Sequence, residues 1–145
     1  MIREKNLAKD YVRLSPVFVF ENDTLFNALE IMKNYEIKNI SIVKDDFSIS
    51  GCINKHEILR ILNTKFNSCI NALKTIKIFD QDLKYENPIV LYPGTSIFDA
   101  YVLMKYFENK YLPIVDVPWE KKIIGFLWLN DILPIVEETY MNVPV

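Results

Sequence analysis

Apolar and polar positions alternate along this chain in two distinct ways. Short runs rich in β-branched and aromatic residues, such as the segment 39–43, are typical of strands. Between them lie segments in which apolar residues recur every three or four positions, as in 25–35 and 97–107. That period places the apolar side chains on one face of a helix, so these segments are predicted to be amphipathic helices.

The pattern of strands and helices occurs twice in the sequence. With an offset of 72 residues, the segment 15–43 aligns with 87–115, and nine of 29 positions are identical. After a two-residue insertion in the second copy, Glu57 aligns with Asp131. Turn residues, apolar positions and glycines recur in one order, which indicates that a single structural unit has been duplicated.

Each copy is predicted to fold in the order β-α-β-β-α, which makes the chain an α+β protein, close to the α/β class. The opening strand begins at a proline, and Thr24 or Ser96 provides the N-cap of the first helix. Ser96 and Asp99 also have the spacing of a capping box. The strands are expected at 16–20, 39–43 and 49–53 in the first copy and at 88–92, 111–115 and 123–128 in the second, and the last helices begin near Glu57 and Asp131.

The repeats set the expected organisation of the chain. The stretch NALKTIKIFD, between the copies, is too apolar for a flexible linker, and we predict that it packs as a helix or as the lead-in to a strand. Both repeats are expected to form one compact module. The expected parts are an N-terminal lead-in at 1–14, a first repeat at 10–65, a connecting segment at 66–86 and a second repeat at 87–141.

Charge and composition narrow the classes of partner. The net charge is −2 and the charges are spread along the chain without a basic stripe, so nucleic acid is not a favoured partner. No apolar run approaches the roughly 18 residues of a membrane span, and the N-terminus does not resemble a signal peptide, so we expect a soluble, cytoplasmic chain. Hydrophobic residues make up 50% and aromatic residues 13%, which favours a buried partner surface.

Few residues are candidates for catalysis or metal binding. Two cysteines and one histidine are too few for a zinc cluster or a disulfide scaffold, so no metal site is expected. Cys52 is interpreted as a small core residue; the alternative is a nucleophile formed with His56, although no third group orients such a pair. Three glycines exclude a P-loop or a Rossmann fingerprint, and we expect no enzyme activity.

Four motifs recur in both copies. They read SPVFV, TLFNALEIM, ISIV and GCINKHEIL in the first copy and NPIVL, SIFDAYVLM, LPIV and GFLWLNDIL in the second. Such a unit resembles the cystathionine-β-synthase (CBS) domain, and two units in register resemble a tandem CBS pair, often called a Bateman module. The resemblance covers residues 10 to about 138, nearly the whole chain.

The resemblance implies an architecture and a function. Two CBS repeats would pack sheet to sheet about a pseudo-twofold axis and leave two clefts, and two modules would form a homodimer. The implied function is that of a non-catalytic regulatory sensor that binds an adenosine-containing ligand in these clefts. The ligand would be AMP, ADP, ATP or S-adenosylmethionine, with no required cofactor, and the regulated partner would be an enzyme, channel or transporter. The alternative is a ligand-free dimerisation or protein-interaction module.

The resemblance also implies the residues of the site. An acid at the start of the last helix accepts hydrogen bonds from ribose hydroxyls, and its counterparts are Glu57 and Asp131. Three residues earlier, where the family has Thr or Ser, stand Asn54 and Trp128. The other candidates are Pro16, Val17, Pro88 and Ile89, whose backbone would frame the adenine, and Lys55, His56 and Arg60, which would meet phosphate; Pro134 replaces the counterpart of Arg60.

Structural roles remain as alternatives for these residues. Glu57 and Asp131 could be first-turn acids that favour the helix dipole, and Asn130 or Asp131 could simply cap the last helix. Trp128 could pack in the core or at a dimer interface, form an aromatic wall against a base, or close the site as a plug. Because Trp128 replaces a small hydroxyl, the half-site of the first copy is favoured. The alternative for Lys55 and Arg60 is a solvated surface position.

Overall fold

The computed structural model describes residues 6–14, 17–80 and 87–141 of the chain. Contacts divide the chain into two compact units, one formed by residues 17–88 and the other by residues 1–16 together with 89–145. Both units combine helices with a small sheet, so the predicted α+β class is confirmed. The boundaries of the two repeats stay a prediction.

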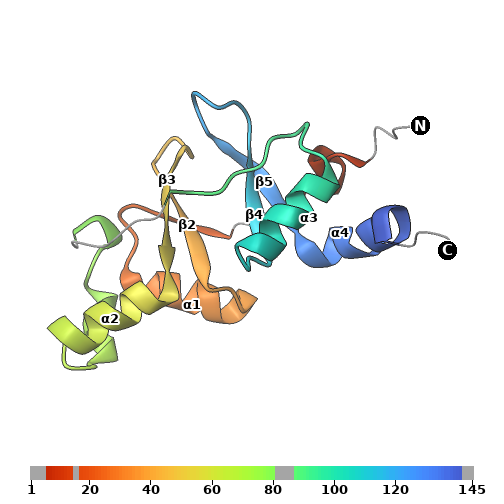
Figure 1. Cartoon of the computed structure of the whole chain (residues 1–145). Helices are drawn as coiled ribbons and strands as arrows, with labels where there is room; N and C mark the ends of the chain where they lie inside the picture. Colours follow the sequence, from red (N-terminus) through yellow and green to blue (C-terminus); the bar gives the residue numbers. More distant parts are fainter. Residues whose placement is uncertain (1–5, 15–16, 81–86, 142–145) are drawn as a thin grey trace. The chain divides into compact units, whose positions relative to one another are not determined.

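The unit of residues 17–88 contains a three-stranded sheet and two helices. Its elements are β1 (Phe18–Phe20), α1 (Leu25–Tyr35), β2 (Asn39–Val43), β3 (Ile49–Asn54) and α2 (Lys55–Lys65). Strand β1 pairs with β2 in parallel, and β3 pairs with β2 in the antiparallel direction. Both helices lie on the same side of the strands (Figure 1). This is the β-α-β-β-α order predicted for the first copy.

The connecting segment packs on this unit, as its apolar sequence predicted. It contains two short 3-10 helices, η3 (Ile70–Lys74) and η4 (Ile78–Asp80). The side chain of Leu73 is fully buried. The backbone N–H of Leu25 donates to the carbonyl oxygen of Ile76 at 2.9 Å, which ties the segment to the first turn of α1.

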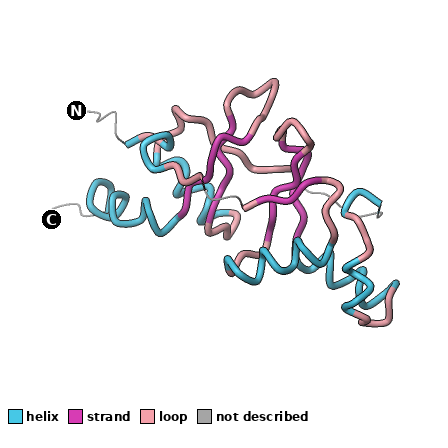
Figure 2. The backbone as a smooth tube through the Cα atoms, turned by 180° about the vertical axis from the view of Figure 1, so that it is seen from behind, coloured by secondary structure: helices cyan, strands magenta, loops and turns pink. Residues whose placement is uncertain are grey.

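The other unit contains a two-stranded antiparallel sheet, with its helices together on one side of it (Figure 2). Its elements are η2 (Ala8–Tyr11), α3 (Ile97–Tyr106), β4 (Tyr111–Val115), β5 (Ile123–Trp128), α4 (Leu129–Val136) and the π-helical turn η5 (Glu137–Met141). Apolar side chains from η2, α3, β4, β5 and α4 meet in one core. Its buried members are Ala8, Leu91, Ile97, Ala100, Met104, Leu112, Ile114, Leu127, Ile132 and Val136.

The first helix of each copy has the N-cap that its sequence predicted. Thr24 Oγ1 accepts a hydrogen bond from the N–H of Asn27 at 3.1 Å, and α1 begins at the next residue. Ser96 Oγ accepts from the N–H of Asp99 at the same distance and begins α3. Each hydroxyl satisfies one of the N–H groups that a helix start leaves without an intrahelical partner.

Backbone irregularities also recur at aligned positions. Glu36 and Glu108, which lie 72 residues apart, both adopt the left-handed conformation, with φ of 55° and 56°. The register of the β-hairpin shifts between Ile42 and Val43 in one copy and between Ile114 and Val115 in the other. The duplication inferred from side chains therefore extends to the conformation of the backbone.

The N-terminal segment, residues 6–14, belongs to the unit of the second copy. Arg13 pairs with Phe126 of β5 in the antiparallel direction, and each N–H donates to the other residue's carbonyl oxygen at 2.8 Å. The segment crosses directly over Gly125, where a Cβ atom would overlap Val12 Cγ2 and lie 3.0 Å from the carbonyl oxygen of Arg13. Glycine is therefore required at position 125 for the segment to reach β5.

The strand predicted at 88–92 is wrong. Within it, only Leu91 forms a bridge, to Ile114 of β4 in the parallel direction. The N–H of Leu91 donates to the carbonyl oxygen of Pro113 at 2.8 Å, and the N–H of Val115 donates back to Leu91 at 2.9 Å.

Two prolines explain why this ladder stops after one residue. Continued towards residue 89, the ladder would need an N–H at position 113, and continued past Leu91 it would need an N–H at position 93. Both positions are proline, which has no backbone N–H. In the first copy the counterpart of Pro93 is Glu21, whose N–H donates to the carbonyl oxygen of Val43 at 3.0 Å.

Candidate functional site

The first half-site lies where β3 passes into α2. Asn54 occupies the N-cap of α2, and its Oδ1 accepts from the N–H of His56 at 2.7 Å. The amide nitrogen of Asn54 donates to Oδ1 of Asn39, its cross-strand neighbour on β2, at 3.1 Å. Asn54 is thus fixed by the helix on one side and by the sheet on the other.

Glu57 and Arg60 form a two-pronged ion pair one turn further along α2. Arg60 Nη2 donates to Glu57 Oε1 at 2.6 Å, and Nε donates to Oε2 at 3.1 Å. The side chain of Glu57 is 13% exposed and that of Arg60 is 46% exposed. The side chain of Glu57 is therefore shielded, while that of Arg60 is about half exposed.

The remaining predicted residues of the first copy differ in their exposure. Lys55 and His56 are exposed in the first turn of α2, beside Glu57. Val17 is fully buried, so its side chain belongs to the core. Pro16 lies outside the described residues.

In the second copy, Asp131 binds Arg13 of the N-terminal segment. Arg13 Nη2 donates to Asp131 Oδ1 at 2.5 Å, and Arg13 Nε lies 2.5 Å from Oδ2. The hydrogen bond and the charge of Asp131 raise the pKa of Arg13 above its ordinary value, against a small opposing effect of desolvation. The side chain of Asp131 is 24% exposed and that of Arg13 is 55% exposed. Sequence reasoning missed Arg13, because 118 residues separate the pair.

Neither Asn130 nor Asp131 is the N-cap of α4. The N-cap of α4 is Trp128, without a side-chain hydrogen bond, and Asp131 is an acid of the first helical turn. Its carboxylate binds Arg13. The capping interpretation is therefore wrong for this helix.

Trp128 stacks on Tyr111, its cross-strand neighbour. The ring centroids lie 5.2 Å apart and the planes are inclined by 25°. The aligned pair in the first copy is Asn39 and Asn54, which share a hydrogen bond at the same register. One copy therefore has two amides where the other has two stacked aromatic rings, and the roles considered for Trp128 towards a ligand stay predictions.

Pro88 and Ile89 lie just before the single bridge at Leu91. Both are half-buried, and Ile89 packs against the apolar core of its unit. Their part in framing a ligand also stays a prediction.

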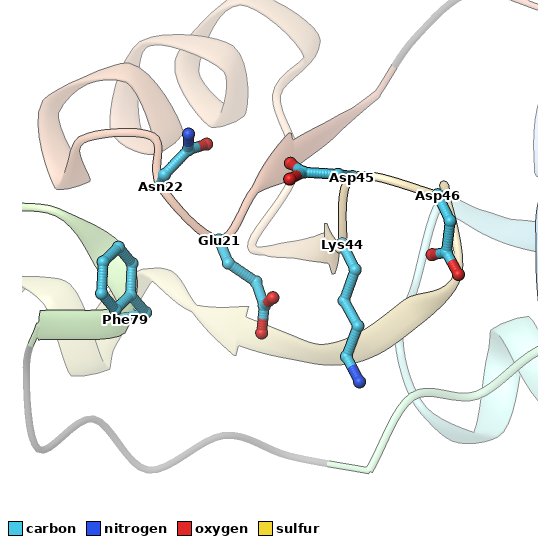
Figure 3. Close-up of a pocket in the computed structure, with 6 residues that line it drawn as sticks. All are labelled: Glu21, Asn22, Lys44, Asp45, Asp46 and Phe79. Carbon is cyan, nitrogen blue, oxygen red and sulfur yellow. The ribbon is translucent and has the colours of Figure 1, made fainter.

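A pocket lies at the opposite end of β2 from Asn54 (Figure 3). It has a volume of about 500 Å³, and sequence reasoning did not find it. Phe79 forms one wall, while Glu21 and Lys44 extend into the space between the loops (Figure 3). The lining residues are Glu21, Asn22, Lys44, Asp45, Asp46 and Phe79. Their carboxylates alone do not indicate a ligand, and we assign the pocket no function.

The described residues offer little for metal or thiol chemistry. Among them, no group of three or more His, Cys, Asp and Glu residues could hold a metal ion. Cys52 is half-buried, Cys69 is exposed, and neither forms a disulfide. None of the helices in the described ranges is long and apolar enough to span a membrane.

Comparisons with known proteins place this arrangement in a family. Residues 8–64 match the family model of the CBS domain. A curated relative, the inosine-5′-monophosphate dehydrogenase of Aquifex aeolicus (strain VF5), is 24% identical over 120 residues. That match covers 83% of this chain but 22% of the relative, so the chain spans about a fifth of the relative's length.

Solved structures share the fold along nearly the whole chain. The structure of CBSX2 in complex with AMP matches with a TM-score of 0.65 at 19% identity; CBSX2 comes from Arabidopsis thaliana. The CBS domain pair of protein MJ0100, in complex with 5′-methylthioadenosine and S-adenosyl-L-methionine, matches with a TM-score of 0.63 at 19% identity. Each match covers 91% of this chain and 96% of the other chain.

The fold is that of a tandem pair of CBS domains. The match of residues 8–64 to the CBS-domain model, together with the shared fold, confirms the resemblance inferred from the repeated motifs.

Proposed function

We propose that this protein is a non-catalytic regulatory module that binds an adenosine-containing ligand. The observation that carries the proposal is the paired acid and guanidinium at the start of the last helix in each copy, Glu57 with Arg60 and Asp131 with Arg13. The ligands of similar proteins support it, since CBSX2 binds AMP and the pair of MJ0100 binds 5′-methylthioadenosine and S-adenosyl-L-methionine. The module would regulate an enzyme, channel or transporter in the cytoplasm, as a homodimer.

Each carboxylate has the chemistry needed to recognise a ribose. An ionised carboxylate offers about four acceptor positions, and a two-pronged arginine uses two of them. A ribose presents two adjacent hydroxyls, and the carboxylate oxygens of Glu57 and Asp131 are acceptors suited to both. Asn54 and Trp128 stand three residues earlier, and we assign them to the sugar and the base.

The other residues of the proposed half-sites have supporting roles. Lys55 and His56 are exposed donors beside Glu57, suited to an anionic group of the ligand. The backbone at Pro16, Val17, Pro88 and Ile89 would frame the adenine.

A thermal-shift titration with AMP, ADP, ATP and S-adenosylmethionine tests the function. A ligand present at 100 times its Kd adds about 2.7 kcal/mol to the free energy of unfolding, which gives a clear rise in melting temperature. Glu57→Gln and Asp131→Asn should each weaken binding, whereas Glu30→Gln, which changes an exposed acid on α1, should not. The absence of a shift with all four ligands at millimolar concentration would overturn the proposal.

The second candidate function is a ligand-free dimerisation or protein-interaction module. The observation that favours it is a group of exposed apolar side chains on and just after α3. Val102 is 48% exposed, Tyr106 78% and Phe107 46%. Exposed aromatic residues of this kind are enriched at protein interfaces. Sedimentation velocity that finds a strict monomer at all concentrations would exclude dimerisation.

A further inference from the structure

The acids of the two proposed half-sites are bound by arginines that come from different parts of the chain. Glu57 receives Arg60 from the same helix, three residues away. Asp131 receives Arg13 from the N-terminal segment. Both arginines approach with Nε and Nη2, one to each carboxylate oxygen.

The sequence of α4 explains why the arginine that binds Asp131 comes from outside this helix. With the two-residue offset of the second copy, Arg60 aligns with Pro134, so α4 carries no guanidinium at that position. The neighbours Lys55 and His56 align with Leu129 and Asn130, which are uncharged. Arg13 thus brings to Asp131 a charge that the aligned positions of α4 lack.

Backbone hydrogen bonds to β5 fix the position of Arg13. Its N–H and carbonyl oxygen both bond to Phe126 at 2.8 Å, and the bare backbone of Gly125 lets the segment approach. A side chain on a segment whose backbone is hydrogen-bonded loses less conformational freedom when it binds a ligand than a side chain on a flexible segment.

In both pairs the side chain of the acid is the more shielded and that of the arginine the more exposed. A guanidinium has five N–H donors, of which the pair uses two, and its planar shape suits a phosphate. Each pair can therefore accept bonds from ribose hydroxyls through the acid and donate bonds to an anion through the arginine.

We propose that Arg13 is a ligand-binding residue that completes the second half-site, and that both half-sites select adenosyl ligands carrying a phosphate over those without one. This inference rests on the proposed function. It adds a residue from outside the repeated motifs and narrows the ligand to a nucleoside phosphate.

Isothermal titration calorimetry with AMP and with adenosine tests the proposal on the full chain. The wild type should bind AMP at least about tenfold more tightly than adenosine, because charge-assisted hydrogen bonds are lost with the phosphate. Arg13→Gln should weaken one class of AMP sites by about tenfold and Arg60→Gln the other, and each should weaken adenosine binding less than it weakens AMP binding. Lys9→Gln removes an exposed charge from the same segment and should leave both ligands unaffected.

The outcomes separate this inference from the proposed function. If no adenosyl ligand binds, the proposed function fails. If AMP and adenosine bind equally well, or if Arg13→Gln leaves AMP binding unchanged, only the present inference fails. Tighter AMP binding by Arg13→Gln would show that Arg13 competes with the ligand and would also overturn it. Arg13→Met, which keeps the apolar stem of the side chain, replaces Arg13→Gln if that variant does not fold.

Discussion

Residues at aligned positions in the two copies share the register of the hairpin but differ in their side chains. At the end of the hairpin, the first copy joins Asn39 to Asn54 through a hydrogen bond, and the second stacks Tyr111 on Trp128. A polar pair and an aromatic pair can both stabilise neighbouring strands. The two half-sites therefore share a frame but differ in the surface that they offer to a ligand.

Thr24→Ala should destabilise the protein by about 1 kcal/mol, because the N–H of Asn27 loses the hydroxyl that accepts its hydrogen bond. Urea denaturation measures the change. Thr24→Ser keeps the hydroxyl and is the matched control, so it should retain most of the stability. An equal loss in both variants would show that the methyl group matters and the cap does not.

Asp116, at the end of β4, should make stability depend on pH in the acid range. Partial desolvation raises its pKa, but hydrogen bonds from the N–H groups of Val117 and Lys122, at 2.7 and 3.0 Å, outweigh it and lower the pKa. A carboxyl group whose pKa is lower in the folded state stabilises the fold above its unfolded pKa of about 3.9, and this contribution is lost as the pH falls through the folded value.

Asp116→Asn removes this contribution and keeps an oxygen that accepts hydrogen bonds. The difference in melting temperature between wild type and variant should be constant above about pH 5 and shrink below about pH 4. Thermal denaturation followed by circular dichroism across this range measures it. A difference that grows as the pH falls would contradict the assignment.

At the scale of elements, local patterns predicted most of the fold. The strands at 39–43 and 111–115 have the predicted bounds, because β-branched residues and flanking turn residues mark them within the sequence itself. The strand at 88–92 failed, although it is equally apolar. Its pairing would need N–H groups at positions 93 and 113, and proline, which has none, occupies both. Position 113 lies on the partner strand, which a local pattern does not include.

Gly125→Ala should loosen the N-terminal segment from β5. The added methyl group would overlap Val12, and overpacking of this kind costs about 1–3 kcal/mol. Gly94→Ala is the matched control, since a Cβ there meets nothing within 4 Å. Hydrogen exchange should show loss of protection at the N–H groups of Arg13 and Phe126 in the first variant alone. Unchanged protection at these N–H groups would mean that the segment accommodates the added methyl group without losing its pairing with β5.

At the scale of the whole molecule, the repeats predicted a tandem CBS pair but not the contacts of the N-terminal segment. The motifs of both copies were sufficient to indicate a tandem CBS pair. The pairing of Arg13 with Asp131 was missed, because no periodicity or motif relates residues that are 118 positions apart. The one available signal was that proline stands at position 134, where the first copy has Arg60. That signal does not indicate which residue supplies the missing positive charge.

Removal of residues 1–14 should destabilise the unit of the second copy and promote aggregation. The deletion takes away the segment that pairs with β5 at Phe126 and leaves the edge of β5 there unpaired, so that it can pair with other chains. Light scattering during a thermal ramp measures the effect. Arg13→Gln keeps the backbone pairing and is the control, so its aggregation should stay close to that of wild type. Equal aggregation of the two variants would contradict the role given to the backbone.

The pairing of residues 6–14 with β5 also orders events during synthesis. These residues are synthesised before the contiguous unit of residues 17–88, and their partner strand β5 is synthesised after it. That unit can fold while the second is still being translated. The long loop adds little to the cost of the final pairing, since each doubling of loop length costs about 0.6 kcal/mol. The contact between Arg13 and Asp131 therefore cannot form until the second unit has been made.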